Sequence, residues 1–376
     1  MTTVIWALGA YSVAATATHI TSILIATNRC RRRNRPSCMT REQPPVSVLR
    51  PVCGIENHGE ETLRSAFHLD YSRYEIIFCA AAANDPAVPV VRRLIARHPH
   101  IPARLLIGNE AISDNPKLNN ICKGWRVAAH DWIVMADSNV LMPSDYLQRL
   151  LAAWGADTGL VASPPVGSRP DGFWAELECA FLNTYQARWQ YTADSLGIGF
   201  AQGKTMLYRK SLIEGAGGIT SLAAEAAEDA ATTKIVRDLG LRVRLVDAPF
   251  EQPLGRRAAR EVWARQLRWA RLRQASFRRY YALEILSGPI APLVAAAVVA
   301  AAWGLSPASV IALAALWYGA EAALAAAAGW QLGLRSPLAW MLRDVLLPVL
   351  WIEGLLGSAV VWRGHHIRTA ESGSTT

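Results

Sequence analysis

Residues Trp132–Asn139 read WIVMADSN, and this short stretch indicates the fold. Its first five residues are apolar and include Ile133 and Val134, which favours a buried β-strand, and Asp137 follows directly. Outward from this stretch, strand-like and helix-like segments alternate. The predicted strands are 46–49, 74–79 and 103–107, and the predicted helices are 60–68, 88–97, 117–129 and 144–154. This alternation predicts βαβ units wound into a mostly parallel α/β sheet.

Acidic residues that follow strands are candidates for a ligand site, because open α/β sheets bind ligands beyond the carboxyl ends of their strands. Asp137 ends the strand 132–136, and Asp85 comes shortly after the strand 74–79. A carboxylate at position 137 suits Mg²⁺ or Mn²⁺, hard cations that combine one or two protein carboxylates with diphosphate oxygens and water. The alternative is that Asp137 and Ser138 form only a strand-ending turn.

Glu228 and Asp229 open a predicted helix that continues to Leu239. An acidic residue in a first helical turn ordinarily caps the helix or complements its dipole, and this remains the alternative. A group transfer to an alcohol, however, needs a carboxylate that accepts the proton of the alcohol. Asp229 is therefore the candidate base, with Glu228 beside it.

A basic motif, Arg265-Gln266-Leu267-Arg268-Trp269, lies in the predicted helical segment 259–282, which has six arginines between positions 265 and 279. One interpretation is an amphipathic helix on anionic lipid. At the helical period, however, the arginines and aromatic residues do not segregate to one face, as a purely interfacial helix should. We therefore expect some guanidinium groups to point inward, where they can neutralise a departing diphosphate.

The N-terminal segment is predicted to cross a membrane. From Val4 to Thr27 only His19 can carry a charge, and the run is long enough to span a hydrocarbon core of ~30 Å. A secretory signal would carry its basic residues before the apolar run, whereas here they follow it, at Arg29, Arg31, Arg32, Arg33 and Arg35. The positive-inside rule places these arginines and the following domain in the cytoplasm.

The C-terminal third is apolar again, in the segments 283–305, 308–330 and 338–361. At least two of these should span the membrane. The third carries Arg343, Asp344 and Glu353, so it is a span that faces protein, a re-entrant piece or an interfacial helix.

The protein is thus expected to be an integral membrane protein with a cytoplasmic catalytic domain. Its expected location is a bacterial inner membrane. Its predicted parts are an N-terminal anchor (1–28), a catalytic domain (40–258), the basic helix (259–282), C-terminal membrane segments (283–366) and a polar tail (367–376).

Composition excludes several classes of protein. The six cysteines show no C-x-x-C spacing, which argues against a zinc site and favours reduced thiols. A net charge of +9 would suit nucleic acid, but the arginines cluster beside apolar spans and no recognition motif is present. The segments that could span a membrane are too few for a transporter. A non-enzymatic membrane receptor stays open.

Together these residues resemble the ceramide glucosyltransferase family, whose members are inverting, nucleotide-sugar-dependent enzymes with a GT-A type fold. That family is marked by three spaced aspartates and a (Q/R)-x-x-R-W motif, matched here by Asp85, Asp137, Asp229 and Arg265–Trp269. Further matching phrases are Leu49-Arg50-Pro51, Leu69-Asp70-Tyr71, Asn115-Pro116-Lys117-Leu118-Asn119-Asn120 and Ala227-Glu228-Asp229. The resemblance covers most of the chain.

The resemblance implies a role for each matching residue. Pro51 and Cys53 would line a uridine pocket, Lys117 would approach the donor, and Asp137 would bind the metal on the diphosphate. Asp229 would be the base. Arg265, Arg268 and Trp269 would bind the donor and help to close the site.

The resemblance also implies UDP-glucose as donor and ceramide as acceptor. UDP-N-acetylglucosamine, UDP-galactose or UDP-glucuronic acid as donor, and a hopanoid or another polar lipid as acceptor, remain alternatives. One departure concerns Ala82, which stands where the family usually has its first aspartate. Either Asp85 alone makes the uridine contact, or donor binding is weakened or altered.

Overall fold

The computed structural model describes residues 2–32, 43–357, 359–362 and 365–368. The basic residues Arg33 and Arg35 and the tail residues 369–376, on which predictions were made above, lie outside this part of the chain.

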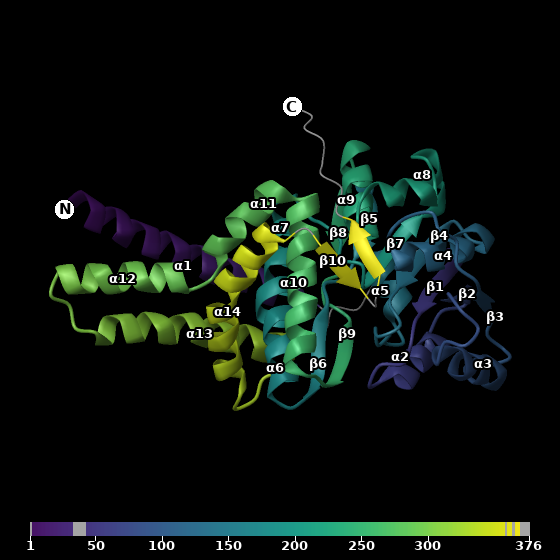
Figure 1. The fold of residues 1–376 in the computed structure, drawn as a ribbon, viewed down its shortest axis with the longest axis horizontal. Helices are drawn as coiled ribbons and strands as arrows, with labels where there is room; N and C mark the ends of the chain where they lie inside the picture. The colour runs from purple at the N-terminus through teal and green to yellow at the C-terminus, as the bar shows by residue number, and fades with distance from the viewer. Residues whose placement is uncertain (1, 33–42, 358, 363–364, 369–376) are drawn as a thin grey trace.

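A seven-stranded sheet forms the centre of the α/β body, with the strand order β3-β2-β1-β4-β7-β5-β8 (Figure 1). Its strands are β1 (Val46–Val52), β2 (Tyr74–Ala80), β3 (Ala103–Ile107), β4 (Trp132–Ala136), β5 (Thr158–Ala162), β7 (Thr205–Arg209) and β8 (Arg242–Leu245). Neighbouring strands run parallel except β7, which is antiparallel to both β4 and β5. The predicted mostly parallel α/β class is confirmed. The reversal at β7 is a feature that the alternation of segments did not predict.

Helices cover both faces of this sheet. They are α2 (Gly59–Ser65), α3 (Ala87–Arg97), α4 (Pro116–Val127), α5 (Tyr146–Ala152), α8 (Lys210–Gly215) and α9 (Glu228–Asp238). Successive strand residues point to opposite faces, so Val134 packs in the hydrophobic cluster with α3 and α5, while Met135 packs in the cluster with α4. The predicted helices lie within a few residues of those observed, except that 60–68 ends in the separate 3₁₀ turn η2 (Ala66–His68).

Local sequence explains where α4 begins. Asn115 accepts hydrogen bonds from the first backbone N–H groups of the helix, and Pro116 occupies its first position, where the missing N–H costs nothing. This cap places Lys117 in the first turn of α4, at the edge of the sheet where β1 and β4 end.

A second layer follows β5, and no sequence pattern predicted it. Strand β6 (Val166–Asp171) pairs in parallel with β9 (Glu251–Arg256). One continuous helical run then consists of α6 (Phe173–Ala180), the π-helical segment η3 (Phe181–Ala187) and α7 (Arg188–Ser195). The predicted basic segment forms α10 (Ala259–Ser276) and α11 (Arg278–Leu283), and α10 packs against α6.

Three apolar helices project from one end of the molecule, with the N-terminus at their far end (Figure 1). They are α1 (Thr2–Arg31), α12 (Ile290–Ala302) and α13 (Ala308–Ala328), and α1 packs against both of the others. By length and composition, α1 and α13 can each cross a membrane. The helical pair Arg278–Ser287 and Ile290–Ala302, bent by 44°, makes a third candidate if it counts as one span. The expectation of at least two C-terminal spans is met on that count.

The third predicted C-terminal segment has a different character. Residues Ser336–Leu356 form α14, which packs against α6 and α10 and is not among the candidate spans of the described residues. The prediction of one apolar membrane segment that continues to Val361 is corrected. The helix ends at Leu356, and the strand β10 (Ala359–Trp362) follows it, paired antiparallel with β11 (His365–Arg368).

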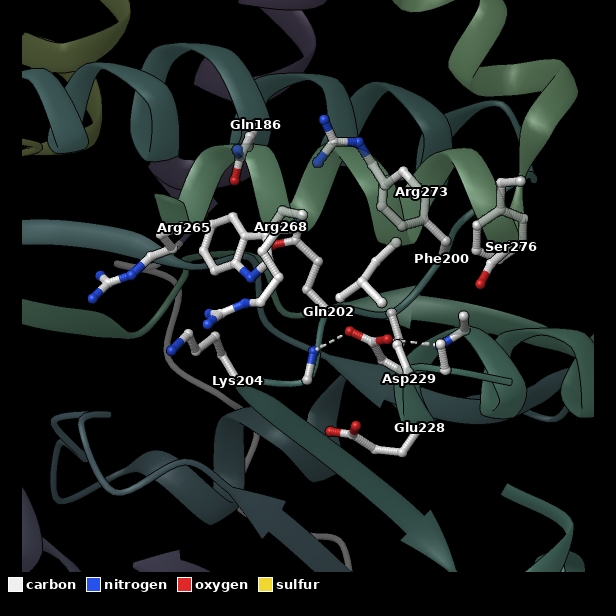
Figure 2. A pocket seen from close by; sticks show the side chains of 18 of the residues that line it. Gln186, Phe200, Gln202, Lys204, Glu228, Asp229, Arg265, Arg268, Arg273 and Ser276 are labelled. Atoms are coloured by element: carbon white, nitrogen blue, oxygen red, sulfur yellow. Dashed lines mark hydrogen bonds between the residues drawn. The ribbon is translucent and has the colours of Figure 1, made fainter. Parts of the chain in front are cut away.

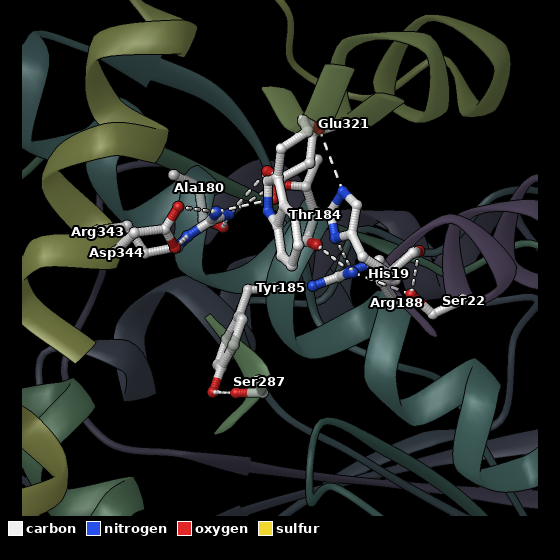
Figure 3. Close-up of polar contacts among 11 residues, drawn as sticks. His19, Ser22, Ala180, Thr184, Tyr185, Arg188, Ser287, Glu321, Arg343 and Asp344 are labelled. Atoms are coloured by element: carbon white, nitrogen blue, oxygen red, sulfur yellow. Dashed lines mark hydrogen bonds and ion pairs between the residues drawn. The ribbon is translucent and has the colours of Figure 1, made fainter. Parts of the chain in front are cut away.

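A buried network of charged side chains explains why α14 carries charges (Figure 3). The guanidinium of Arg343 pairs with Glu321 of α13 at 2.9 Å and with Asp344 at 2.8 Å, and it donates to the hydroxyl of Thr184 in η3 at 2.9 Å. The Arg343, Glu321 and Asp344 side chains are at most 2% exposed. Their opposite charges compensate one another out of contact with solvent.

The same network reaches the N-terminal helix. Arg188 of α7 donates to the carbonyl of Thr184 and contacts His19 Nδ1 and Ser22 Oγ of α1 at 2.7 and 2.9 Å. His19 stacks on Trp317 of α13. The anchor, the C-terminal helices and the helical run η3–α7 are therefore held together by polar contacts that no single segment could satisfy alone.

We predict that Arg343→Met lowers the stability of the protein by about 3–5 kcal/mol, because it leaves buried carboxylates without their counter-charge. The check is the thermal midpoint of unfolding in detergent. The matched control is Arg93→Met, which breaks an exposed pair with Glu60 at 2.8 Å and should cost about 1 kcal/mol or less. Equal midpoints for the two variants would contradict the assigned role of the network.

Candidate active site

One cavity of about 1520 Å³ runs from the sheet to the apolar helices. At the sheet it is lined by residues at or just beyond the carboxyl ends of four strands: Val52 for β1, Ala81 for β2, Asn109 for β3 and Asp137 for β4. At its other end it is lined by α1 and α13. The edge of the sheet that bears the cavity is the one expected from the strand directions.

The ammonium of Lys117 lies at the centre of the sheet side of the cavity. It contacts Asp137 Oδ1 at 2.7 Å and Glu228 Oε1 at 2.6 Å, and it donates to the Gly203 carbonyl at 2.5 Å. Only 12% of the side chain is exposed. Burial alone would lower the pKa of Lys117, but the two carboxylates outweigh it and raise the pKa above its ordinary value. Lys117 therefore stays charged and joins three parts of the site.

Asp137 contacts a second cation with its other oxygen. Lys204 Nζ lies 3.0 Å from Asp137 Oδ2 and 3.3 Å from Asn139 Oδ1. Burial would raise the pKa of Asp137, but Lys117 and Lys204 lower it to about 2. The carboxylate is thus negatively charged at any physiological pH.

Asp137 and Asn139 could supply two of the oxygen ligands of a metal ion. Their two oxygens already converge on a cation, the ammonium of Lys204. Within the part of the chain that the structure describes, no three His, Cys, Asp or Glu side chains gather as a metal site. A hard cation here would therefore take its remaining ligands from water and from the oxygens of a bound diphosphate.

Glu228 and Asp229 open α9 and have different surroundings. Glu228 is buried, and besides Lys117 it accepts a hydrogen bond from the Asn115 amide at 2.8 Å. Asp229 accepts from the backbone N–H groups of Gly203 and Ala230 at 2.7 and 2.8 Å (Figure 2). Burial, and then the neighbouring Glu228 carboxylate, raise the pKa of Asp229 to about 7. Asp229 can accept a proton near neutral pH, whereas Glu228 is committed to Lys117.

Three cationic side chains lie across the cavity from Asp229 and Glu228. The cationic ends of Lys204, Arg265 and Arg268 lie on one side, and the carboxylates of Asp229 and Glu228 lie on the other (Figure 2). A negatively charged leaving group would find its counter-charges on the first side, and a proton acceptor stands on the second.

A buried carboxylate holds the basic motif in place through Arg265. Glu178 of α6 has a fully buried side chain and binds Arg265, and it also contacts Arg257 Nε at 3.2 Å. Arg257 also forms an ion pair with Glu56 at 3.1 Å, and Glu56 accepts a hydrogen bond from the Asn139 amide at 3.2 Å. A chain of polar contacts thus connects α10 to the residues beside Asp137.

Most of the residues predicted from the sequence meet in this cavity. Those that line it are Pro51, Cys53, Lys117, Asp137, Glu228, Asp229, Arg265, Arg268 and Trp269. Asp85 is not among the lining residues. Its carboxylate accepts from the N–H groups of Gly54 and Ala87 and so holds the loop after β1 to the start of α3. The predicted donor contact of Asp85 stays a prediction.

Neither the contact of Lys204 with Asp137 nor the role of Glu178 was predicted from the sequence. Lys204 reaches Asp137 because β7 runs antiparallel beside β4, so that the residue before β7 lies next to the residue after β4. In the sequence, Gln202-Gly203-Lys204-Thr205 is either a loop that shapes the acceptor side or a plain turn before a strand at 206–209. Glu178 lies in the second layer, for which the sequence showed no recognisable pattern.

The chain is similar to known glycosyltransferases in sequence. The model of Glycosyl transferase family 21 matches residues 6–375. Ceramide glucosyltransferase 3 of Caenorhabditis elegans is 26% identical over 340 residues, 88% of this chain and 74% of the relative. The ceramide glucosyltransferase of Komagataella phaffii is 41% identical over 112 residues, 29% of this chain and 22% of the relative.

A solved structure supports the fold. The mannosyltransferase from Pyrobaculum calidifontis, in complex with GDP-Man and Mn²⁺, is similar with a TM-score of 0.51 and 21% identity, over 93% of this chain and 99% of that one. The predicted GT-A type fold is therefore confirmed. Because the family model covers the chain almost from end to end, the protein belongs to glycosyl transferase family 21 and is a glycosyltransferase.

Proposed function

We propose that this glycosyltransferase transfers glucose from UDP-glucose to the primary hydroxyl of ceramide, with inversion at the anomeric carbon. The observation that carries the proposal is the single cavity that extends from Lys117, Asp137 and Asp229 to the apolar helices α1 and α13. A nucleotide-sugar from water and a lipid that stays in the bilayer can meet only in a site open to both. The relatives named as ceramide glucosyltransferases support this choice of sugar and lipid.

The proposed location is a bacterial inner membrane, with the catalytic domain in the cytoplasm. In support, Arg29 and Arg31 stand at the end of α1 that meets the catalytic domain. Arg29 also pairs with Asp194 and Asp247, both at 2.8 Å, so it joins the anchor to the domain.

On the donor side, Pro51 and Cys53 would contact the uridine, and Lys204 and Arg268 would stabilise the departing diphosphate by their positive charge. Arg265 supports this side from its contact with Glu178. Mg²⁺ or Mn²⁺ held by Asp137 and Asn139 would neutralise negative charge that develops on the diphosphate.

On the acceptor side, Asp229 would accept the proton of the primary hydroxyl. As that proton leaves, the hydroxyl oxygen forms a bond to the anomeric carbon, and the bond from this carbon to the diphosphate oxygen breaks. The products are a glycolipid, UDP and protonated Asp229. A single displacement of this kind inverts the anomeric carbon and needs no covalent enzyme intermediate. The raised pKa of Asp229 suits this proton transfer.

The test is to reconstitute the purified chain in vesicles with ceramide, UDP-glucose and Mg²⁺ or Mn²⁺ and to analyse the lipids by mass spectrometry. We expect a β-linked glucosylceramide, formed only with the metal present. A product with another UDP-sugar or with a hopanoid, and none with this pair, would overturn the assigned substrates. No glycolipid or UDP release from any pair would favour a receptor.

We predict that Asp229→Asn lowers the transfer rate by about 10²–10⁴-fold, because the amide cannot accept the proton of the alcohol. UDP-glucose binding, measured by calorimetry, should be close to that of the unmodified protein. Asp238→Asn, at the exposed far end of α9, is the control and should leave both quantities unchanged. Transfer by Asp229→Asn within a few-fold of the control would remove Asp229 as the base.

We predict that Gly203→Ala lowers transfer by about a hundredfold without unfolding the protein. A Cβ at this position would lie 2.7 Å from Glu228 Oε1 and 3.0 Å from Lys117 Nζ, so it must displace their ion pair. The control is Gly215→Ala, whose Cβ would meet nothing within 4 Å. Full activity of Gly203→Ala, at an unchanged thermal midpoint, would show that the position of Lys117 does not matter.

A further inference from the structure

Several of the residues that line the cavity carry buried polar atoms that have no partner. Among the described residues, Tyr11 Oη, Trp189 Nε1, Trp317 Nε1 and Gln186 Oε1 lack hydrogen-bond partners, and all four residues line the cavity. Trp317 is 3% exposed and Gln186 is 8% exposed. Leaving such groups unpaired is unfavourable, so a set of them around one space indicates a ligand that supplies the missing partners.

The shape of this region fits a lipid chain. Tyr11, Ala14, Ala15 and Thr18 line the cavity from α1, and their spacing of three and four residues places them on one face of the helix. With a rise of about 1.5 Å per residue, this face extends for roughly 10 Å along α1. The small side chains of Ala14 and Ala15 leave room beside α1, a helix long and apolar enough to cross a membrane.

The unpaired atoms have definite hydrogen-bonding roles. The indole N–H groups of Trp189 and Trp317 can only donate, and the side-chain carbonyl of Gln186 can only accept. Gln186 Nε2 donates to Gln266 Oε1 at 2.8 Å, so Oε1 is the atom of the Gln186 amide that is left without a partner. Figure 2 shows Gln186 on the wall of the cavity opposite Glu228 and Asp229.

We propose that Gln186, with Trp189 and Trp317, forms a subsite that binds the amide group of the lipid acceptor, and that Gln186 selects lipids that carry an amide N–H. This inference rests on the proposed function. In the subsite the indole N–H groups donate to the amide carbonyl of the lipid, and Gln186 Oε1 accepts from its N–H. One hydrocarbon chain lies along the face of α1 from Tyr11 to Thr18.

Gln186 is the selective member of the subsite. Ester carbonyls and amide carbonyls both accept from an indole N–H, so the two tryptophans cannot distinguish an ester lipid from an amide lipid. Only an amide offers an N–H to the Gln186 carbonyl. A lipid without that donor leaves a buried acceptor unpaired, which corresponds to a loss of about ten- to a hundredfold in kcat/KM.

The experiment compares ceramide with a ceramide of identical chains that is methylated on the amide nitrogen. Both are presented in mixed vesicles with UDP-glucose, and kcat/KM is measured for each. The unmodified protein should prefer ceramide by about tenfold or more. In Gln186→Met the preference should fall close to one, because turnover of ceramide falls and turnover of the methylated lipid does not. If the preference came from steric exclusion of the methyl group, it would persist in this variant.

The matched control is Gln266→Met, which removes the same glutamine–glutamine hydrogen bond but leaves the Gln186 amide in the cavity. It should retain the preference, and so should Gln186→Glu, which keeps an acceptor oxygen. A preference near one in the unmodified protein, or an undiminished preference in Gln186→Met, would overturn the subsite while the proposed function stands. Absence of glucosyl transfer to either lipid by the unmodified protein would instead reject the proposed function.

Discussion

The position of the Lys117 ammonium between Asp137 and Glu228 is the constraint on which the rest of the site depends. At 12% exposure of the lysine side chain and 7% of the Glu228 side chain, neither group could remain charged without the other at an acceptable cost. The contacts of Lys117 with Asp137 and Glu228 therefore hold the end of β4 against the start of α9. The hydrogen bond from Lys117 to the Gly203 carbonyl also holds the loop before β7. As a result, the Asp137 carboxylate is held in place relative to the start of α9, which carries Asp229.

Two further sets of buried charges hold the surrounding helices in place. Glu178 holds Arg265 and Arg257, and through Glu56 it couples the basic helix α10 to the neighbourhood of Asp137. Arg343 and its partners hold α13 and α14 to the segment η3. Each set is compensated internally, which is the condition for keeping charges away from water.

The π-helical segment η3 lies where these requirements meet. Thr184 takes part in the buried network behind the segment, and Gln186, two residues later, faces the cavity. A π-helical segment changes the direction in which successive side chains point, and such segments are frequent at functional sites. In this protein one short stretch therefore contributes both to the packing of the apolar helices and to the lining of the candidate active-site cavity.

By itself the sequence determined the alternating α/β body, the N-terminal apolar helix and the acidic residues at the ends of strands, because these follow from local periodicity and from residue types that recur at fixed spacing. Asp137 could be found in this way, and Asp229 could be found from its place in the first turn of a predicted helix. Only the tertiary structure decided that Lys204 contacts Asp137, that Glu178 holds Arg265, and that Asp85 lies outside the cavity lining. The contacts of Lys204 and Glu178 join segments about 70 to 90 residues apart, and that of Lys204 also depends on the reversed direction of β7. Local sequence patterns do not specify which distant polar atoms come into contact when the chain packs.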